Sequence, residues 1–393
     1  MQKSIKKEKP KNFSTILFSL CFCCIILSGF VAMIYDIQNQ ISEIVITENK
    51  LSNFSLKSII TDVSIFEDKL KPINSMLQKN VLQKKEIDDF KYYKNIDGGY
   101  IITRSPKSVE TIKSQQQNIK ALYDSATQNG ADFLYISMPS RVNDTYREIL
   151  SNIDFSNDYK DMLLSGIHSD IPTLDLRKIS EIESLESSYY KTDHHWNVES
   201  IFLAFKATIA ELNTLYELSL DSQKIYTNLD NYEILVSQNT FSGSTRQNVG
   251  EIYLEKEDFK LYSPIYPTGF VYEHYINGEL DKEKHGDFQE ALCNMEIFEN
   301  DKYLNKYNVF LGGGYVENRI YNELSDNNKK LLLISSSYGR PFAPYISQCF
   351  SEVIFLDPQN GRYTDNMIDY IDQYNPDVVL VLHDDYVSAN VTK

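Results

Sequence analysis

Cysteine is scarce in this sequence, and its scarcity limits both disulfide and metal chemistry. Only five cysteines occur in 393 residues, and three of them lie between positions 21 and 24, within an apolar run. The other two, Cys293 and Cys349, could form a single disulfide, but nothing in the sequence shows that they meet. Outside the apolar run no cysteine spacing matches a zinc site, and we expect the chain to need no metal or other cofactor.

Positive charge is also in short supply. The chain has 39 Lys and Arg residues against 55 Asp and Glu residues, which gives a formal net charge of −16 and an isoelectric point near 4.9. Phosphate backbones and anionic membrane surfaces repel such a protein, so we expect no nucleic-acid partner. Internal repeats and long low-complexity tracts are missing as well, so a repeat architecture is not expected.

Long hydrophobic runs are absent except for one near the N-terminus. Residues 1–12 form a basic tail with five lysines and one glutamate, and residues 13–35 carry no charge. As a helix this run would be about 34 Å long, enough to cross a bilayer. Lysines before the run and acids after it predict a cytoplasmic N-terminus and an extracytoplasmic remainder. A cleaved signal peptide is the alternative, although no A-x-A or lipobox site is evident.

The rest of the chain divides into a lead-in and one large domain. Residues 36–95 are polar and compatible with helix, and we interpret them as a helical stalk. Residues 96–393 alternate short apolar strands with longer helices, which is typical of a parallel sheet in an α/β domain. Residues 225–310 interrupt this pattern and are interpreted as an insertion of short strands and loops. The expected strands are 100–102, 133–138, 171–176, 331–334, 353–356 and 378–382, and the expected helices are 108–129, 144–152, 158–167, 199–218, 341–350 and 364–374.

Residue types that suit catalysis gather at Asp193-His194-His195-Trp196, which holds two of the six histidines and the only tryptophan. In an Asp-x-His pair the imidazole can accept a proton, while the carboxylate orients the ring and stabilises its charged form. The same residues could equally form a metal site or an ordinary surface turn. Trp196 is expected to pack this turn onto the sheet.

A candidate nucleophile follows the strand at 331–334. Ser335, Ser336 and Ser337 stand at its carboxyl end, where sites form in parallel sheets, and a helix is expected soon after them. The amide of Ser337 would lie near the positive end of that helix and could stabilise an oxyanion. Serines after a strand are also common in solvated loops. The prediction therefore depends on the serine and the Asp-x-His pair occurring together.

Together these features resemble the DHHW proteins, which are related to the AlgJ/AlgX-type alginate O-acetylation proteins of the SGNH hydrolase superfamily. The resemblance implies a three-layer α/β/α fold with a mostly parallel sheet, over most of the chain after residue 95. It also implies the transfer or removal of acetyl groups on extracellular polysaccharide. The features that carry it are Asp193-His194-His195-Trp196, the serine turn before Phe342-Ala343-Pro344-Tyr345, the single N-terminal anchor, Phe310-Leu311-Gly312-Gly313 and Asp357-Pro358.

The resemblance implies roles for particular residues of this chain. Ser337 would be the nucleophile, His195 the general base and Asp193 the carboxylate that orients the base. Arg340 could hold an anionic sugar, brace its loop or simply lie on the surface. The further candidates for oxyanion stabilisation and substrate binding are Gly243, Ser336, Arg340 and His194.

The sequence departs from the family at one position. Relatives usually have an aspartate directly before the nucleophilic serine, where this chain has Ser336. The change removes a side chain that can brace the turn, and it supports an alternative: a catalytically decayed binding or scaffold protein of cell-envelope polysaccharide assembly. A further alternative is a metal site that combines the DHHW histidines with His383, Asp384 and Asp385.

The leading hypothesis is a membrane-anchored, extracytoplasmic acetyltransferase or carbohydrate esterase that uses a Ser-His-Asp triad and no cofactor. Its substrate would be a cell-surface or secreted polysaccharide. A transferase would also need an acyl donor, for which a membrane-bound donor protein is the expected partner. Transferase is preferred to esterase only through the family resemblance.

Overall fold

The computed structural model describes Cys24, Ser28 and residues 77–87, 91–95, 97–142, 147, 149–167, 169–314, 316–358 and 367–383. The chain divides into two compact units, residues 1–81 and 82–393. A short π-helix, Leu77–Val81, is described at the end of the first unit. The expected membrane segment 13–35, most of the 36–95 lead-in and most of the expected helix 144–152 lie outside these residues. Within the described ranges, no helix has the length and apolar character that a membrane span requires.

The second unit is built on a mixed sheet of eight strands in the order β5-β4-β13-β11-β12-β10-β8-β9. The first five strands of this order are parallel to one another, and the last three continue the sheet in antiparallel fashion. The α/β class with a large, mostly parallel sheet is therefore confirmed. The parallel strands are β4 (Asp132–Ser137), β5 (Thr173–Asp175), β11 (Lys330–Ser335), β12 (Glu352–Leu356) and β13 (Val378–His383).

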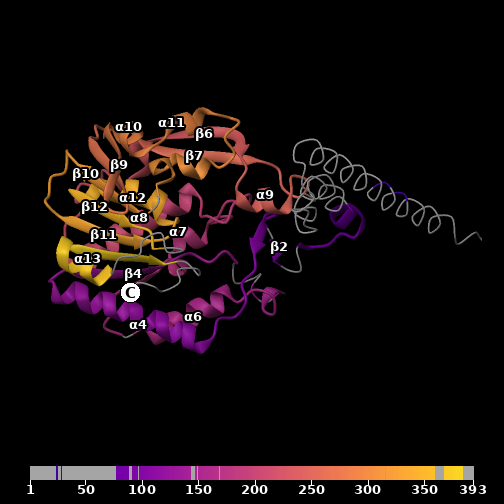
Figure 1. Cartoon of the computed structure of the whole chain (residues 1–393), viewed down its shortest axis with the longest axis horizontal. Helices are drawn as coiled ribbons and strands as arrows, with labels where there is room; N and C mark the ends of the chain where they lie inside the picture. Colours follow the sequence, from indigo (N-terminus) through magenta and orange to yellow (C-terminus); the bar gives the residue numbers. More distant parts are fainter. Residues whose placement is uncertain are drawn as a thin grey trace, which may run out of the picture. The chain divides into compact units, whose positions relative to one another are not determined.

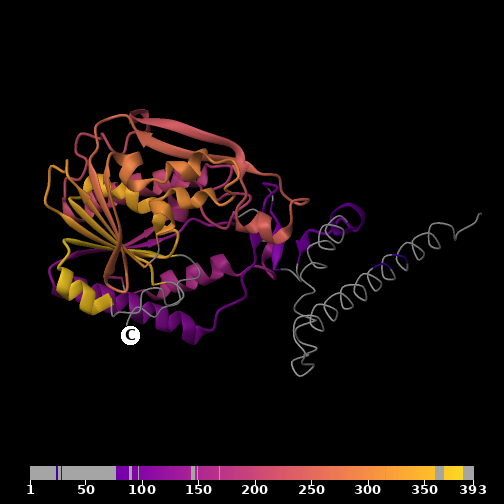
Figure 2. The same cartoon turned by 45° about the horizontal axis from the view of Figure 1, so that its top comes forward.

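Helices cover both faces of this sheet (Figures 1 and 2). Side chains along each strand alternate between two cores: Leu331 and Leu333 pack on the side of α8 and α12, whereas Leu332 and Ile334 pack on the side of α4, α6 and α13. The result is an α/β/α sandwich. The helices are α4 (Val109–Gln128), α6 (Ser156–Gly166), α8 (Val198–Tyr216), α12 (Gly339–Ile346) and α13 (Met367–Tyr374), with a short α7 (Ser180–Glu183) before α8.

The helix ends follow the capping signals of the sequence. Ser108 caps α4 by accepting a hydrogen bond from the N–H of Thr111. The chain leaves α4 through Gly130, whose φ of +76° suits glycine after a helix. Asn197 caps α8 in the same way, accepting from the N–H of Ser200 at 2.9 Å. Because Asn197 follows His195 by two residues, this cap fixes where the DHHW segment meets the helix.

Strand β13 is the last described strand in the sequence but lies in the middle of the sheet. It pairs with β11 on one side, where Val378 faces Leu331, and with β4 on the other, where Val378 faces Asp132. Its successive residues Val379 and Leu380 belong to opposite cores. The two segments that form β4 and β11, about 200 residues apart in the chain, are therefore joined only through β13.

The expected insertion at 225–310 contains two kinds of strand. β6 (Tyr232–Phe241) and β7 (Glu257–Pro264) form a separate two-stranded ribbon, whereas β8 (Phe270–Ile276) and β9 (Glu279–Gly286) extend the main sheet through β10 (Glu317–Asn322). Three short helices belong to the same part of the chain: α9 (Ser244–Val249), α10 (Phe288–Leu292) and α11 (Met295–Glu299). A third, small sheet contains β1 (Glu86–Ile87), β2 (Tyr92–Lys94) and β3 (Tyr100–Ile102). β1 and β2 lie within the segment 36–95 that we expected to be helical, so its described end includes strands instead.

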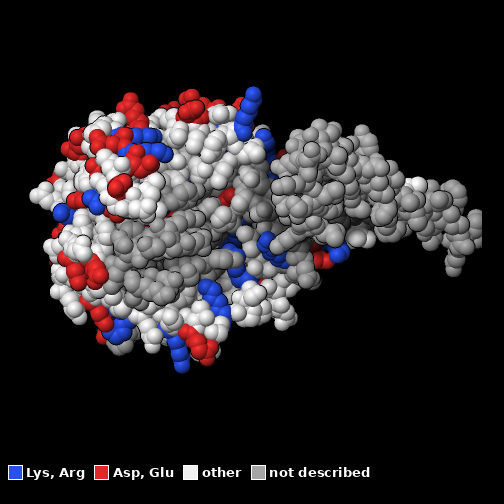
Figure 3. All heavy atoms as spheres, in the orientation of Figure 1, with Lys and Arg blue, Asp and Glu red and all other residues white. Residues whose placement is uncertain are grey.

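Strand β9 forms one edge of the large sheet and is strongly charged. Its residues Glu279 to Lys284 include three acids and two lysines, and nearly all of them are exposed. Figure 3 shows red and blue side chains together over this part of the molecule, at the upper left. Mixed charges on an edge strand hinder its pairing with another chain.

The two cysteines of the domain do not form a disulfide. Cys293 and Cys349 are both buried, and both thiols are free. Burial raises the pKa of each thiol well above its usual value. Both side chains therefore behave as small apolar groups of the core on the α8 and α12 side.

Helix α12 begins almost in contact with the end of β11. A Cβ atom on Gly339, the first residue of α12, would lie 2.6 Å from the Cβ of Ser335 and 2.9 Å from the ring of Phe355. Real Cβ atoms do not approach other atoms this closely. Glycine at this position is therefore required for the helix to start directly after the serine turn.

We expect Gly339→Ala to lower the free energy of unfolding by about 1–3 kcal/mol, because the added methyl group forces helix and strand apart. Denaturant unfolding followed by the fluorescence of Trp196, the single and fully buried tryptophan, measures the loss. Gly269→Ala is the matched control, since its new Cβ would meet nothing nearer than 3.4 Å. Equal stability of the two variants would contradict the close approach.

Candidate active site

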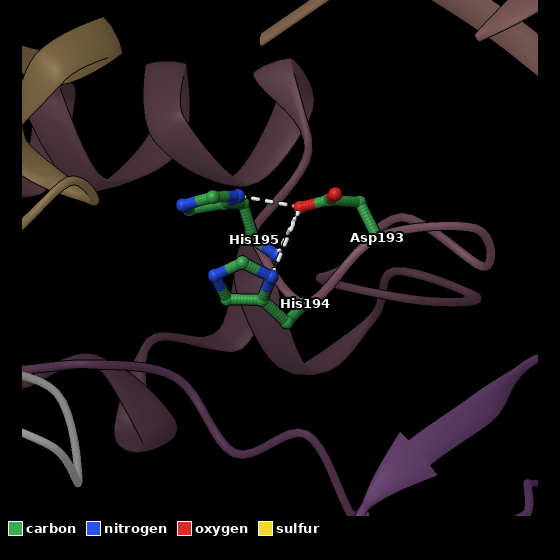
Figure 4. Close-up of side chains that lie close together, drawn as sticks. All are labelled: Asp193, His194 and His195. Atoms are coloured by element: carbon green, nitrogen blue, oxygen red, sulfur yellow. Dashed lines mark hydrogen bonds and ion pairs between the residues drawn. The ribbon is translucent and has the colours of Figure 1, made fainter. Parts of the chain in front are cut away.

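Three side chains predicted from the sequence meet in one hydrogen-bonded row. His195 Nε2 lies 2.9 Å from Ser337 Oγ, and His195 Nδ1 lies 2.5 Å from Asp193 Oδ1. Figure 4 shows the rings of His194 and His195 each turning a nitrogen toward the Asp193 carboxylate. A hydroxyl, an imidazole and a carboxylate in this order form the arrangement that activates a serine oxygen as a nucleophile.

The fold brings the two parts of this row together at the carboxyl ends of the parallel strands. Ser337 lies between the carboxyl end of β11 and the start of α12, and the DHHW segment lies directly before α8. The two helices pack against each other on the same face of the sheet. Residues 142 positions apart in the sequence thereby meet where sites of parallel α/β sheets usually form.

Two cross-bonds fix the DHHW segment to the serine turn. Trp196 Nε1 donates to the main-chain oxygen of Tyr338 at 3.1 Å, and the hydroxyl of Tyr338 donates back to the main-chain oxygen of His194 at 2.7 Å. The indole is fully buried, and its ring lies against Phe342 of α12. Trp196 therefore packs the DHHW segment against α12 and the serine turn, next to the contact between His195 and Ser337.

The carboxylate of Asp193 is 1% exposed and accepts hydrogen bonds on both oxygens. Oδ1 accepts from the main-chain N–H of His195 at 2.9 Å, and Oδ2 accepts from that of Ser244 at 2.6 Å. Burial acts to raise the pKa of Asp193. The attraction of His195 and His194 and these hydrogen bonds outweigh burial and hold that pKa well below its usual range. Asp193 is therefore charged at neutral pH.

Gly243 lies on the carboxylate side of the row. A Cβ atom on Gly243 would come within 2.3 Å of the Cβ of Asp193, so glycine is needed for the close approach. The N–H of Gly243 donates to Thr192 Oγ1 at 3.2 Å. The amide that we expected in an oxyanion hole thus holds the segment around Asp193, and the role of Gly243 in the structure is to make room for that carboxylate.

Both histidines are held in their neutral form. Burial lowers the pKa of His195, with the positive charges of Arg340 and Arg141 adding to the effect, and the attraction of Asp193 opposes it. Burial and the proximity of His195 lower the pKa of His194 to about 3. A neutral His195 has a lone pair on Nε2, which a proton acceptor requires.

Aromatic rings and a hydroxyl fix the orientation of the histidines. The ring of Tyr307 stacks on His195, with ring centres 3.9 Å apart and planes 15° apart. Tyr307 belongs to the 3-10 helix η5 (Lys306–Val309). His194 is half-buried, and its Nδ1 lies 2.6 Å from Ser244 Oγ and 3.5 Å from Asp193 Oδ1. His194, which the sequence suggested as a candidate for oxyanion stabilisation or substrate binding, uses its Nδ1 in these contacts and so supports the segment around Asp193.

Arg340 is 3% exposed, so the interpretation as a surface arginine is wrong. Its Nη1 donates to Asn308 Oδ1 at 2.9 Å, which links α12 to η5 and braces the loop that carries Tyr307. Ser336 is fully buried and its hydroxyl has no hydrogen-bond partner, and the same holds for Ser335. The hydroxyl of Ser336 therefore does not replace the bracing aspartate of the relatives.

Residues without a motif complete the site. Glu257, the first residue of β7, accepts from the main-chain N–H groups of Lys191 and Thr192 at 3.1 and 2.6 Å. Arg141, in the loop after β4, donates through Nη2 to the main-chain oxygen of Asp193 at 2.6 Å. Sequence reasoning missed these residues because a side chain that binds main-chain atoms of a distant segment leaves no local pattern.

The metal alternative fits the geometry poorly. Asp193, His194 and His195 could offer ligand atoms within 4.8 Å of one another. Two ligand atoms on one tetrahedral zinc ion lie about 3.3 Å apart, whereas Asp193 Oδ1 and His195 Nδ1 are 2.5 Å apart, a hydrogen-bond distance. The backbone of His383 ends β13 opposite Ser137, and the proposed co-ligands Asp384 and Asp385 lie outside the described residues.

Comparison with known proteins shows the fold. No family model and no curated protein matches the sequence. Bacillus cereus PatB1, solved with a sulfonyl adduct, is 17% identical over 76% of this chain and 97% of that chain, with a TM-score of 0.59. A DHHW family protein from Eubacterium siraeum is 16% identical over 72% and 86% of the two chains, with a TM-score of 0.54. The chain therefore shares the fold of a DHHW family protein, as its motif predicted.

The neutral histidines predict how stability depends on pH. The unperturbed imidazole pKa is 6.5, and the folded value for His194 is about 3, so between these values the unfolded chain binds more protons than the folded one. The free energy of unfolding should therefore fall as the pH falls from about 6.5. Urea unfolding across this range should show a shallower fall for His194→Gln than for the native chain. An identical slope would mean that His194 is protonated in the folded protein.

Proposed function

We propose that the protein is a serine acyltransferase or esterase in which Ser337 is the nucleophile, His195 the general base and Asp193 the orienting carboxylate. The observation that carries the proposal is the distance of 2.9 Å between His195 Nε2 and Ser337 Oγ, with the opposite ring nitrogen bonded to a buried, charged Asp193. Tyr307 and Trp196 fix the ring and the turn, so the groups are positioned before a substrate arrives.

The proposed reaction proceeds in two steps. Ser337 Oγ attacks the carbonyl carbon of an acyl ester while His195 Nε2 takes the hydroxyl proton, and the tetrahedral intermediate collapses as that proton passes to the leaving oxygen. A second hydroxyl then attacks the acyl-serine ester, and His195 again takes and returns one proton. Asp193 stays charged throughout and stabilises the imidazolium. The main-chain N–H group of Ser337, which lies just before α12, would stabilise the oxyanion.

The substrate class is proposed from the relatives. PatB1 has been solved with a sulfonyl adduct, and sulfonyl groups attach to activated serine hydroxyls. By the family resemblance, the acyl group is acetyl and the acceptor is a hydroxyl group of a cell-surface or secreted polysaccharide. Transfer rather than hydrolysis would require a donor, and a membrane-bound acyl-donor protein is the proposed partner. No cofactor is needed for this chemistry.

The alternative is a binding or scaffold protein on a decayed hydrolase fold. Its support is Ser336, which stands in place of the usual aspartate and whose hydroxyl binds nothing. The close spacing of Ser337, His195 and Asp193 favours the enzyme, because a protein that only binds needs no polarised serine. The experiment on Ser337 below separates the two.

We expect the full chain, purified in detergent, to release nitrophenol from p-nitrophenyl acetate and to be inactivated by phenylmethylsulfonyl fluoride with one added sulfonyl group. Ser337→Ala should abolish the adduct and lower the rate by about a thousandfold or more, and His195→Ala should lower the rate similarly. Ser335→Ala is the matched control, since it removes a neighbouring buried hydroxyl that makes no hydrogen bond. Steady-state kinetics and intact-mass spectrometry measure both effects.

The outcomes distinguish the proposals. Release of nitrophenol and adduct formation that survive Ser337→Ala would exclude Ser337 as the nucleophile. A folded chain that neither hydrolyses the ester nor reacts with the sulfonyl fluoride would support the binding alternative. Retained activity after dialysis against a chelator is expected, and loss that zinc restores would support the metal alternative.

We also propose that residues 13–35 anchor the chain in the cell membrane and that the domain from about residue 96 lies outside the cytoplasm. The support is the uncharged run with lysines before it and acids after it. Expressed in bacteria, the full chain should resist alkaline extraction from membranes, and protease added to spheroplasts should digest the domain. A chain found free of the membrane with a new N-terminus after the run would indicate a cleaved signal peptide instead.

A further inference from the structure

We infer that His194 binds the acyl acceptor, and that its Nε2 accepts a hydrogen bond from a hydroxyl group next to the one that becomes acylated. The inference rests on the proposed function and deepens it, because it makes a pair of adjacent hydroxyls, a vicinal diol, the group that the site recognises. The proposed reaction employs Asp193, His195 and Ser337 and leaves Nε2 of His194 without a role.

The two imidazoles of the DHHW segment lie side by side and face the same way. Their ring centres are 3.8 Å apart, and their planes are tilted by 37°. Nδ1 of each ring lies near Asp193 Oδ1, at 2.5 Å for His195 and 3.5 Å for His194. Figure 4 shows Nε2 of both rings on the side away from that carboxylate. Because Nε2 of His195 contacts Ser337 Oγ, Nε2 of His194 also lies on the side of the nucleophile.

Nε2 of His194 is available to a ligand. The His194 side chain is 30% exposed, against 8% for His195 and 1% for Asp193. Within the described part of the chain, Nε2 of His194 has no hydrogen-bond partner, whereas Nδ1 lies 2.6 Å from Ser244 Oγ. The hydroxyl of Tyr338 donates to the main-chain oxygen of His194. A substrate that approaches from solvent would therefore meet a ring that is held on one side and open on the other.

The surroundings of Nδ1 determine the chemistry of Nε2. A proton on Nδ1 is attracted by the charged Asp193 and can be donated to Ser244 Oγ, whereas a lone pair on Nδ1 would face the carboxylate. The ring carries only this one proton at neutral pH, since burial and the proximity of His195 lower the pKa of His194 to about 3. Nε2 therefore has a lone pair, and it can bind a hydroxyl group but not an ether oxygen.

A sugar presents a group that fits two such nitrogens. In the second step of the proposed reaction, one hydroxyl gives its proton to Nε2 of His195 and attacks the acyl-serine ester. Neighbouring hydroxyl oxygens of a sugar lie roughly 2.8 Å apart, the usual distance between hydrogen-bonded oxygens, so the next hydroxyl can reach the adjacent ring at the same time. His194 stays neutral and orients the acceptor. A simple alcohol lacks the group that makes this contact.

The test compares acceptors that differ in one group. The full chain is given p-nitrophenyl acetate as donor and trans-cyclohexane-1,2-diol, the monomethyl ether of that diol or cyclohexanol as acceptor, and the acetylated products are quantified by mass spectrometry. We expect kcat/KM per hydroxyl group to be about fivefold or more higher for the diol than for cyclohexanol. The methyl ether should behave like cyclohexanol, because its oxygen has no proton to donate to Nε2.

Two substitutions of His194 separate the roles of its ring nitrogens. An asparagine amide reaches the place of Nδ1, and a glutamine amide reaches that of Nε2. His194→Asn should reduce the ratio of diol to cyclohexanol rates toward one, whereas His194→Gln should retain part of the ratio. A purely structural role of His194 would leave this ratio unchanged in both variants. His285→Asn, at an exposed histidine of β9, is the matched control and should keep the native ratio.

A spectroscopic measurement tests the same contact without any reaction. In the full chain labelled with ¹⁵N-histidine, NMR should show the proton of His194 on Nδ1 and none on Nε2. Added trans-cyclohexane-1,2-diol should shift the Nε2 signal, and cyclohexanol should shift it less. The signals that disappear in His194→Asn identify the residue. A proton on Nε2 of His194 would overturn the inference.

The outcomes separate this inference from the proposed function. Native protein that releases no nitrophenol would reject the proposed function, and the NMR measurement would then decide on the hydroxyl contact alone. Acetyl transfer at equal kcat/KM per hydroxyl to the diol and to cyclohexanol would overturn the inference and leave the catalytic proposal intact. A preference for the diol that persists in His194→Asn would also overturn it. If that variant does not fold, the three acceptors given to the native chain still decide.

Discussion

The buried carboxylate of Asp193 is the constraint on which the rest of the site depends. An ionised group that is 1% exposed is costly unless hydrogen bonds replace its water. The chain supplies them from His195 and Ser244, and Gly243 lacks the Cβ atom that would occupy the same space. Because these partners come from two segments about 50 residues apart, α9 and the DHHW segment must pack together for the carboxylate to be buried in its ionised form.

The sandwich architecture then determines where the nucleophile can lie. α8 and α12 share one face of the sheet, so the segments that precede them meet at the same edge. The reciprocal bonds between Trp196 and Tyr338, and between Tyr338 and His194, convert this approximate meeting into a fixed distance. Tyr307 stacks on the His195 ring. General packing brings the residues near one another, and a few specific polar contacts complete the geometry.

The local features of the sequence predicted the local features of the structure. Alternating apolar strands and capped helices gave the parallel part of the sheet, and the DHHW and serine motifs identified the three residues that meet in the site. Contacts between distant segments were not predictable. Glu257 and Arg141 act on main-chain atoms, and Arg340 of α12 is fixed by Asn308 of η5, 32 residues away in the sequence. The expected insertion contributes β8 and β9 to the main sheet. Antiparallel strands have the same local residue pattern whether they extend this sheet or form a separate ribbon, so the sequence did not show which sheet they join.

The central position of β13 has a consequence for the order in which the domain can assemble. As the chain is synthesised from its N-terminus, β4 appears long before β13, the strand that lies between β4 and β11, and β11 appears about 40 residues before it. Until β13 emerges, each partial sheet exposes an unpaired, apolar strand, and such edges are prone to wrong pairing. The two parts of the sheet can therefore join only after residue 378 is available, which leaves the strand edges of β4 and β11 without their central partner until then.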